Sequence, residues 1–311
     1  MRETGDPRFF ALLLREGSLA AAARQLGVTP SAVTQRLQGL EAKLGVRLLD
    51  RSTRRMRLTD EGALYHEHAL ILVRDYDELI DTLRSRKALV RGRLRVHGPL
   101  GFGRRYLAPV VASFHTAHPQ LDIALTLSDR RADAGTAGDA HDLVVHIGEL
   151  RDSSQVAYSI APNERVLCAA PAYLKRAGRP ATPDALNQHA CLVLRENDED
   201  VTMWRFSGRK SSAQGSGKRE VAVRVKPVLS SNDGDVIKQW ALAGKGVMLR
   251  SEWDVADMLR TGALETLLPA WKPPPANVVA LVAERKGMSA RVKTFLAFLA
   301  AAFKPVPWRV R

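Results

Sequence analysis

Short apolar clusters separated by glycines run through the first fifty residues and predict a series of short helices. The cluster Phe9–Leu14 is followed by Gly17, which is typical of a helix and its C-terminal glycine. Ser18 then precedes an alanine-rich segment that ends at Gly27, and serine is a favoured N-terminal helix cap. Four consecutive alanines in this second helix allow a neighbouring helix to pack closely. The pattern therefore predicts two helices joined by a tight turn, with a third to follow.

The third predicted helix, residues 30–44, has one apolar and one polar face. Its apolar positions recur at spacings of four, three and four residues, the pattern of a buried stripe: Val33, Leu37, Leu40 and Leu44. A helix-turn-helix with a polar second helix is typical of DNA binding, because hydroxyl and amide side chains reach base edges while arginines hold phosphates. The predicted DNA contacts from this region are Ser18, Thr29, Pro30, Ser31, Thr34, Gln35 and Arg36.

Residues 46–58 alternate polar and apolar positions on both sides of a polar turn, which predicts two short strands. The wider region, residues 24–57, carries eight basic side chains against two acidic ones. A cationic hairpin beside a helix-turn-helix suits the phosphates of DNA. We therefore predict a wing whose tip brings four residues to the DNA backbone: Arg51, Thr53, Arg54 and Arg55.

A long helix is predicted after the wing. Thr59 is a capping residue, and the acids that follow it are favoured by the helix dipole. Residues 63–91 contain no glycine or proline, and apolar positions recur at four, three and four residues: Leu72, Tyr76, Leu79 and Leu83. Because such a length exceeds what a small domain can bury, residues 59–91 are predicted as a linker helix that mediates dimerisation.

From residue 92 onward, strand-like apolar segments alternate with helical ones. Strands are predicted in RGRLRVHGP, LDIALTLSDR, HDLVVHIGEL, RVLCAAPAYL, ACLVLR, VAVRVKPVLSSND, GVMLRSEW, ETLLPAW and VVALVAER. Helices are predicted in GFGRRYLAPVVASFHTAHP, around Val236–Ala243, and in the closing segment SARVKTFLAFLAAAF. This rhythm is typical of an α/β fold with a parallel sheet.

Ligands in open α/β folds bind beyond the carboxyl ends of the strands, so these ends hold the candidate ligand site. The first strand end contains two glycines and opens a helix, whose N–H groups and dipole favour an anion. Glycines that serve only tight turns, and a Ser231–Asn232 pair that only caps a helix, are the structural alternatives. The predicted ligand-binding residues are Pro99, Leu100, Gly101, Phe102, Gly103, Ser128, His146, Gly148, Trp204, Ser231 and Asn232.

Composition narrows the class of protein. With 311 residues, 45% of them hydrophobic and 26% charged, the chain is expected to form two or three globular domains. The net charge of +14 favours a polyanionic partner. Two cysteines, Cys168 and Cys191, are too few to cross-link a chain of this size, which favours a reducing compartment. No apolar run approaches a membrane span, and the opening MRETGDPRFF lacks the apolar core of a secretory signal. We therefore expect a cytoplasmic protein without a membrane partner.

The segment GSLAAAARQLGVTPSAVTQRLQGLEAKLGVRLLDRSTRRMRLTDEG resembles the DNA-binding signature of LysR-type transcriptional regulators almost element by element. The remaining chain also looks like the ligand-binding half of that family, so the resemblance covers nearly all residues. It implies an N-terminal winged helix-turn-helix with a long linker helix, then a two-lobed α/β effector-binding domain of periplasmic-binding-protein type. The implied divisions are the DNA-binding domain at 1–58, the linker helix at 59–91, lobe one at 92–161 plus 266–303, lobe two at 162–265, and an exposed tail at 304–311.

The resemblance implies a bacterial DNA-binding transcriptional regulator, a homodimer or homotetramer on double-stranded promoter DNA, and no catalysis. A small-molecule effector between the lobes would bias the arrangement of the subunits. Four segments look similar to the branch that includes regulators of D-malate and tartrate use: GPLGFGRRYLAP, LVVHIGELRDSS, APNERVLCAAPAYL and SSNDGDVIKQWALAGKGVMLRSEW. A small hydroxy or dicarboxylic acid is the first expected effector, with aromatic carboxylates and quinone-like oxidants left open. Where the family often has Ser or Thr at the first strand end, this chain has Gly98, Pro99 and Leu100.

Three other classes of function are the alternatives to this interpretation. A thiol redox-sensing regulator would use Cys168 or Cys191 as its input, although their apolar flanks favour core positions. A solute-binding protein could share the two-lobed half, but it would need a secretion signal and no DNA-binding head. An enzyme would need a catalytic constellation, and the sequence contains no HExxH, GxSxG or paired-cysteine motif. No cofactor or metal site is predicted.

Overall fold

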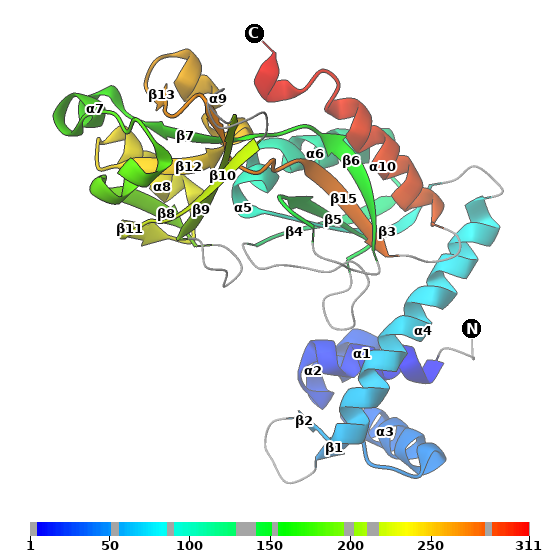
Figure 1. Ribbon diagram of the computed structural model, residues 1–311. Coiled ribbons are helices and arrows are strands. Elements are labelled where there is room, and N and C mark those ends of the chain that lie inside the picture. The colour runs from blue at the N-terminus through cyan, green and yellow to red at the C-terminus, as the bar shows by residue number, and fades with distance from the viewer. Residues whose placement is uncertain are drawn as a thin grey trace. The chain divides into compact units, whose positions relative to one another are not determined.

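The structure is a computed structural model that describes residues 5–50, 56–85, 90–128, 141–150, 155–195, 202–209, 218–283 and 288–310. The chain forms an N-terminal unit that contains α1 to α4 and a C-terminal unit that begins at Val90 (Figure 1). None of the described helices combines the length and the apolar character that a membrane crossing requires.

Three short helices and a two-stranded hairpin precede one long helix in the N-terminal unit. The elements are α1 (Gly5–Glu16), α2 (Leu19–Leu26), α3 (Pro30–Leu44), β1 (Leu49–Asp50), β2 (Arg57–Leu58) and α4 (Asp60–Ser85). Gly27 and Gly45 end α2 and α3 with φ of 67° and 73°, a backbone region in which a side chain would be strained. The predicted order of helices, hairpin and long helix is confirmed.

The core of this unit forms where the apolar faces of α1, α2 and α3 meet. It consists of Phe9, Phe10, Leu13, Ala22, Ala23, Val33, Leu37, Leu40, Leu48 and Leu49. The first turns of α4 join it, with Phe10 and Tyr65 edge to face at 5.3 Å between ring centroids. A Cβ on Gly62 would lie 1.9 Å from the Leu48 carbonyl oxygen. Only glycine therefore lets α4 begin so close to the first wing strand.

Further along α4, apolar side chains stay exposed. Leu72 and Leu79 are 55% and 54% exposed. They are seven residues apart and therefore lie on one face of the helix, as in the stripe predicted for dimerisation. The helix is described as far as Ser85, and residues 86–89 of the predicted linker lie outside the described ranges.

Lobe one of the C-terminal unit is built on a five-stranded sheet with the order β4-β3-β5-β15-β6. Its strands are β3 (Gly92–Gly98), β4 (Leu121–Leu127), β5 (Leu143–Ile147), β6 (Gln155–Ala161) and β15 (Val278–Ala283). Strand β3 is parallel to β4 and β5, and β15 runs antiparallel to β5 and β6. The sheet is therefore mixed, with a parallel half that begins the unit and an antiparallel strand from near the C-terminus.

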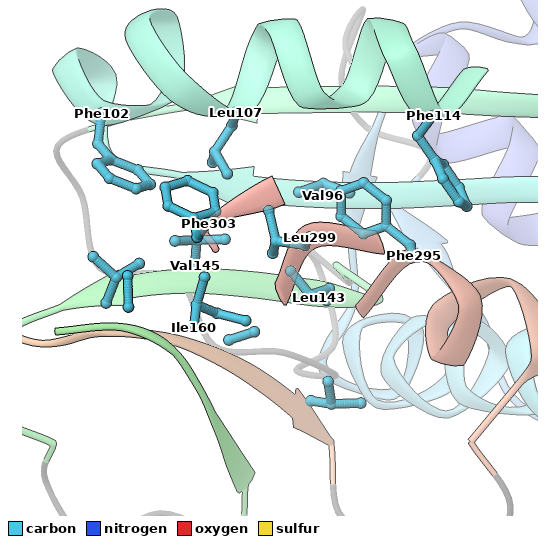
Figure 2. Packing of buried hydrophobic residues seen from close by; sticks show 14 of the residues in the cluster. Val96, Phe102, Leu107, Phe114, Leu143, Val145, Ile160, Phe295, Leu299 and Phe303 are labelled. Atoms are coloured by element: carbon cyan, nitrogen blue, oxygen red, sulfur yellow. The ribbon is translucent and has the colours of Figure 1, made fainter. Parts of the chain in front are cut away.

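Two helical segments cover one face of this sheet. A continuous run follows β3: α5 (Leu100–Phe102), the π-helical η1 (Gly103–Leu107) and α6 (Ala108–Ala117). Figure 2 shows Phe102, Leu107 and Phe114 directed from this run toward side chains that include Phe295 and Leu299 of α10 (Ala290–Ala302). The rings of Phe114 and Phe295 meet at 5.0 Å, so the two helical segments pack on each other as well as on the sheet.

Lobe two contains two sheets. The five-stranded sheet has the order β11-β8-β12-β7-β13, and the three-stranded sheet has the order β10-β9-β14. The strands are β7 (Arg165–Ala169), β8 (Cys191–Leu194), β9 (Met203–Arg209), β10 (Lys218–Arg224), β11 (Pro227–Ser231), β12 (Val247–Ser251), β13 (Glu265–Thr266) and β14 (Trp271–Lys272). The helices are α7 (Pro171–Ala177), the 3-10 helix η2 (Pro183–Gln188), α8 (Gly234–Leu242) and α9 (Glu252–Arg260).

The chain passes between the lobes twice, and it returns later than expected. Residues 265–272 pair with lobe-two strands, since Thr266 faces Cys168 and Trp271 faces Gly208. The return therefore follows Lys272 rather than residue 266, and we propose lobe boundaries at 161/162 and 277/278. Buried Asn163 ties the two crossings together, because its Nδ2 donates to the Ala276 carbonyl at 2.7 Å.

The C-terminal segment docks on the unit, so the expectation of an exposed tail is wrong. Trp308, in η4 (Pro307–Arg309), is 4% exposed, and its ring lies 5.3 Å from that of Tyr106. Arg309 pairs with the carboxylate of Glu252 in α9 at 2.6 Å. The aromatic partners of Trp308 come from distant parts of the chain, which is why a local pattern gave no sign of them.

Candidate DNA interface and effector site

Hydroxyl groups at the starts of α2 and α3 stabilise the helix-turn-helix. Ser18 Oγ accepts a hydrogen bond from the Ala21 N–H at 3.1 Å, and Thr29 Oγ1 accepts one from the Ala32 N–H at 3.3 Å. Thr29 Oγ1 also lies 2.9 Å from Ser31 Oγ. Ser18 and Thr29, both predicted DNA contacts, are thus N-terminal caps whose side chains remain exposed.

The polar face of α3 lies opposite its buried stripe. Ser31, Gln35 and Gln38 are exposed and share this face, because residues three and four apart are neighbours on a helix. Thr34 Oγ1 donates to the Pro30 carbonyl at 3.0 Å, so its proton is used inside the helix. Within the described residues, the Gln35 amide makes no hydrogen bond. It therefore offers a donor and an acceptor together, the combination that an adenine edge requires.

Arg36 faces α1 instead of the polar face of α3. Its guanidinium donates to the Gly5 carbonyl at 2.7 Å and lies 4.5 Å from the centroid of the Phe9 ring. Lys43, two turns later, pairs with Asp6 of α1 at 3.2 Å. This geometry conflicts with the prediction that Arg36 contacts DNA, because both cations are used to hold α1 against α3.

Glu41 holds the wing to α3, a role that the sequence did not indicate. Its carboxylate is buried, at 7% exposure, and accepts from the backbone N–H groups of Leu48 at 2.8 Å and Leu49 at 3.2 Å. In the sequence it is one of two acids in a basic stretch. The contact joins α3 to the start of β1, and no helical or strand periodicity links those positions.

The base of the predicted wing is present. Strands β1 and β2 pair antiparallel, with Leu49 opposite Leu58. Thr59 Oγ1 donates to the Arg47 carbonyl at 2.7 Å and accepts from the Gly62 N–H at 3.0 Å, so it caps α4 and ties that helix to the wing. The predicted tip residues Arg51, Thr53, Arg54 and Arg55 lie outside the described residues.

The strand ends of lobe one bring several predicted ligand residues to one edge of the sheet, because β4, β3 and β5 are parallel neighbours. Ser128 follows β4, and its Oγ lies 2.9 Å from His97 Nε2 at the end of β3. His146 is the next-to-last residue of β5, and its Nε2 lies 3.1 Å from the Glu149 carbonyl oxygen. Gly148 follows with φ of 120°, a backbone conformation that favours glycine.

The helix start between these strand ends offers backbone N–H groups, while some of its residues serve only packing. The first hydrogen bond of the helical run is donated by the Gly103 N–H to the Pro99 carbonyl at 2.7 Å. The N–H groups of residues 100–102 come before this bond and so have no carbonyl partner within the run. The Phe102 side chain is fully buried in the lobe-one core, so only its backbone borders the predicted site. A Cβ on Gly103 would lie 2.1 Å from Leu127 Cδ2, and this glycine therefore serves the packing of the helix on the sheet.

Of the ligand residues predicted in lobe two, two lie at the start of α8 and one is buried in the core. Ser231 Oγ accepts from the Asp233 N–H at 3.1 Å, and Asp233 in turn accepts from the Asp235 N–H at 2.8 Å as the cap of α8. Asn232 between them is exposed. Trp204 is buried among lobe-two core residues that include Phe206, so the structure does not support its predicted place in the ligand site.

Charged pairs join the lobes beside this region. Arg104, just after the helix start, pairs with Asp235 of α8 at 2.7 Å. Lys238 Nζ lies 2.7 Å from Asp235 and 2.5 Å from the buried carboxylate of Asp254, which also pairs with Arg250 at 2.6 Å. The hydrogen bond from Lys238 holds the pKa of Asp235 below its usual value. The network links lobe one to α8 and α9.

The cysteines are buried in lobe two. Burial raises the pKa of both Cys168 and Cys191 to about 12, so neither carries a reactive thiolate near neutral pH. Cys168 faces Met248 and Cys191 faces Val247 on either side of β12. Two strand spacings place their backbones roughly 10 Å apart, beyond the ~7 Å limit for a disulfide. The arrangement argues against the thiol redox alternative.

Comparison with known proteins covers both units. Residues 6–63 match the family described as bacterial regulatory helix-turn-helix protein, lysR family, and residues 87–304 match the LysR substrate binding domain. The chain is 37% identical over 296 residues to the HTH-type transcriptional activator TtdR of Escherichia coli. This alignment covers 95% of the chain and 92% of that relative. It is 35% identical over 298 residues to the HTH-type transcriptional regulator DmlR of Escherichia coli, which covers 96% and 94%.

Solved structures of full-length regulators share the fold. The Vibrio cholerae virulence activator AphB aligns with a TM-score of 0.59 at 23% identity, covering 95% of this chain and 98% of that one. CrgA, a LysR-type transcriptional regulator from Neisseria meningitidis, aligns with a TM-score of 0.57 at 26% identity, covering 95% and 97%. The matched helix-turn-helix family, TtdR and DmlR are transcriptional regulators, and such regulators are not enzymes. With a helix-turn-helix head and an effector-binding half that both match, the chain belongs to the LysR family of transcriptional regulators.

Proposed function

We propose that this LysR-type regulator responds to a small organic acid, a short hydroxy or dicarboxylic acid, bound between the two lobes. The parallel strand ends that carry Ser128, His146 and Gly148 at one edge of lobe one support this site. The acid class is supported by the four segments that resemble the branch of regulators of D-malate and tartrate use. The extensive similarity to TtdR and DmlR is in keeping with that branch.

On the DNA side, Gln35 is proposed to read a base. The observation that carries this role is its exposed amide on the face of α3 opposite the core. The Gln35→Ala variant should lose about 1–3 kcal/mol of affinity for the specific operator and little for random DNA. Gln239→Ala, an exposed glutamine on α8 in the other unit, is the control and should bind both DNAs like wild type. Equal losses of Gln35→Ala on both DNAs would show that Gln35 does not read sequence.

The exposed stripe on α4 is proposed to pair two chains, in a dimer that assembles further into a homotetramer. Leu72 and Leu79 are more than half exposed, and a heptad spacing of apolar side chains suits a partner helix. Two DNA-binding heads would then face two operator half-sites. Because a regulator of promoter DNA works where that DNA lies, we propose a cytoplasmic location.

The wing and the caps complete the proposed interface. Arg51, Thr53, Arg54 and Arg55 are proposed to contact phosphates, since in the sequence they lie between the paired strands β1 and β2 and belong to the basic stretch 24–57. Ser18 and Thr29 stand at helix N-termini, where the helix dipole favours a phosphate. Arg36 is not part of this proposal, because its guanidinium is engaged with α1.

A further inference from the structure

Arg165 begins β7 at the point where the chain has just entered lobe two. It faces Ser251, the last residue of β12, in the strand register. Strands β8, β11 and β12 are parallel, so their carboxyl ends lie along this same edge of the lobe-two sheet. Arg165 therefore stands at the edge of lobe two on which a ligand of an open α/β sheet is expected.

The Arg165 guanidinium also reaches the strand end of lobe one. Its Nη2 atom lies 3.4 Å from the position that a Cβ on Gly148 would occupy, and His146 Nε2 lies 3.9 Å from the same point. A guanidinium and an imidazole thus flank a glycine backbone at the carboxyl end of β5. Any other residue at position 148 would be strained, and its side chain would begin in the space between these two groups.

Arg165 differs from other arginines near the lobe junction because no carboxylate in the described part of the chain pairs with it. Arg104 pairs with Asp235 and Arg250 pairs with Asp254. Among the residues that the structure describes, half-buried Arg165 has neither an ion pair nor a side-chain hydrogen bond. A guanidinium is always charged and presents its N–H donors in a planar fork that matches a carboxylate. The position is therefore suited to an anion from outside the chain.

We propose that Arg165 is the cationic anchor for a carboxylate of the effector, with His146 and the Gly148 backbone beside it. This inference rests on the proposed function and names a binding residue of the same site. Ser128 and Gly148 follow strands on either side of β3, so they are at least two strand spacings, roughly 10 Å, apart. This separation leaves room for a short dicarboxylate with one carboxylate at Arg165 and the other toward Ser128.

The test is calorimetric titration of the full chain with D-malate, tartrate and succinate, and with butyrate as a monocarboxylate. Arg165→Gln should weaken dicarboxylate binding at least tenfold, which corresponds to about 1.4 kcal/mol. Arg165→Lys keeps the charge but not the fork and should lose less. Arg205→Gln is the matched control, since Arg205 is an exposed lobe-two arginine that also has no partner within the described ranges. Its titrations should equal those of wild type.

The outcomes separate this inference from the function on which it rests. Equal dicarboxylate affinity of wild type and Arg165→Gln overturns the anchor and leaves the effector site in place. A wild type that binds none of the acids overturns both the anchor and the organic-acid effector, while operator binding measured without acid still tests DNA recognition. Loss of binding by Arg165→Gln with unchanged operator affinity and unfolding midpoint supports the anchor. A tenfold loss for dicarboxylates with no preference over butyrate in wild type overturns the dicarboxylate selectivity.

Discussion

Replacing Trp308 with alanine should strongly destabilise the C-terminal unit, although the residue is only three positions from the end of the sequence. The indole is buried, and its ring lies 5.3 Å from Tyr106, 5.9 Å from Phe303 and 6.1 Å from Phe102. Truncating a buried tryptophan to alanine removes its transfer free energy and leaves a cavity, at a cost of about 3–5 kcal/mol. For a domain of this size, that loss lowers the unfolding midpoint by roughly 6–20 °C.

Scanning calorimetry of the full chain measures this midpoint directly, and two variants serve as controls. Trp308→Phe keeps an aromatic ring and removes an indole N–H that has no hydrogen-bond partner in the described part of the chain, so it should cost less than Trp308→Ala. Arg309→Gln breaks a partly exposed ion pair with Glu252 and should cost no more than about 1 kcal/mol. If Trp308→Ala unfolds within about 0.5 kcal/mol of wild type, the docking of the C-terminal segment is refuted.

Three further outcomes are expected. Asp254→Asn should lower the free energy of unfolding in urea by about 3–5 kcal/mol, because two largely buried cations then face a neutral side chain; a loss within about 0.5 kcal/mol would contradict the network. Native thiols should react with a disulfide reagent at pH 8 about a thousandfold more slowly than in the urea-unfolded chain, since burial raises both pKa values from 9.0 to about 12, and equal rates would reopen the redox alternative. Arg54→Ala should reduce the slope of log DNA affinity against log salt concentration by about one in magnitude, and an unchanged slope would count against a wing contact.

The features that the sequence predicted well depend on residues near one another in the chain. A helix cap needs a hydroxyl and an N–H two or three residues on, and the predicted caps Ser18 and Thr59 both make such bonds. In α3, Val33, Leu37 and Leu40 are buried as their helical spacing predicted, whereas Leu44 of the same predicted stripe is 40% exposed at the end of the helix. The hairpin that follows was likewise indicated by its alternating positions. For these elements the local pattern and the tertiary structure agree.

The features that the sequence did not indicate are set by distant contacts. Glu41 and Trp308 meet their partners through tertiary packing, which a pattern of spacings does not encode. Helix α9 was not predicted, because it begins at Glu252 directly after β12 with no glycine or proline between them. Arg165 belongs to the same group: its strand was expected, but its nearness to Gly148 depends on how the chain crosses between the lobes.

The central claim is that an organic acid held by the effector half changes what the helix-turn-helix does on DNA. Its most direct test is operator binding by the full chain. Footprinting and affinity are measured on the DNA flanking its own gene, with and without saturating D-malate, tartrate or succinate. The account predicts that at least one acid alters the protected region or changes the affinity by about 5–150-fold, the usual range of allosteric coupling. Identical footprints and identical affinities with every acid would contradict it.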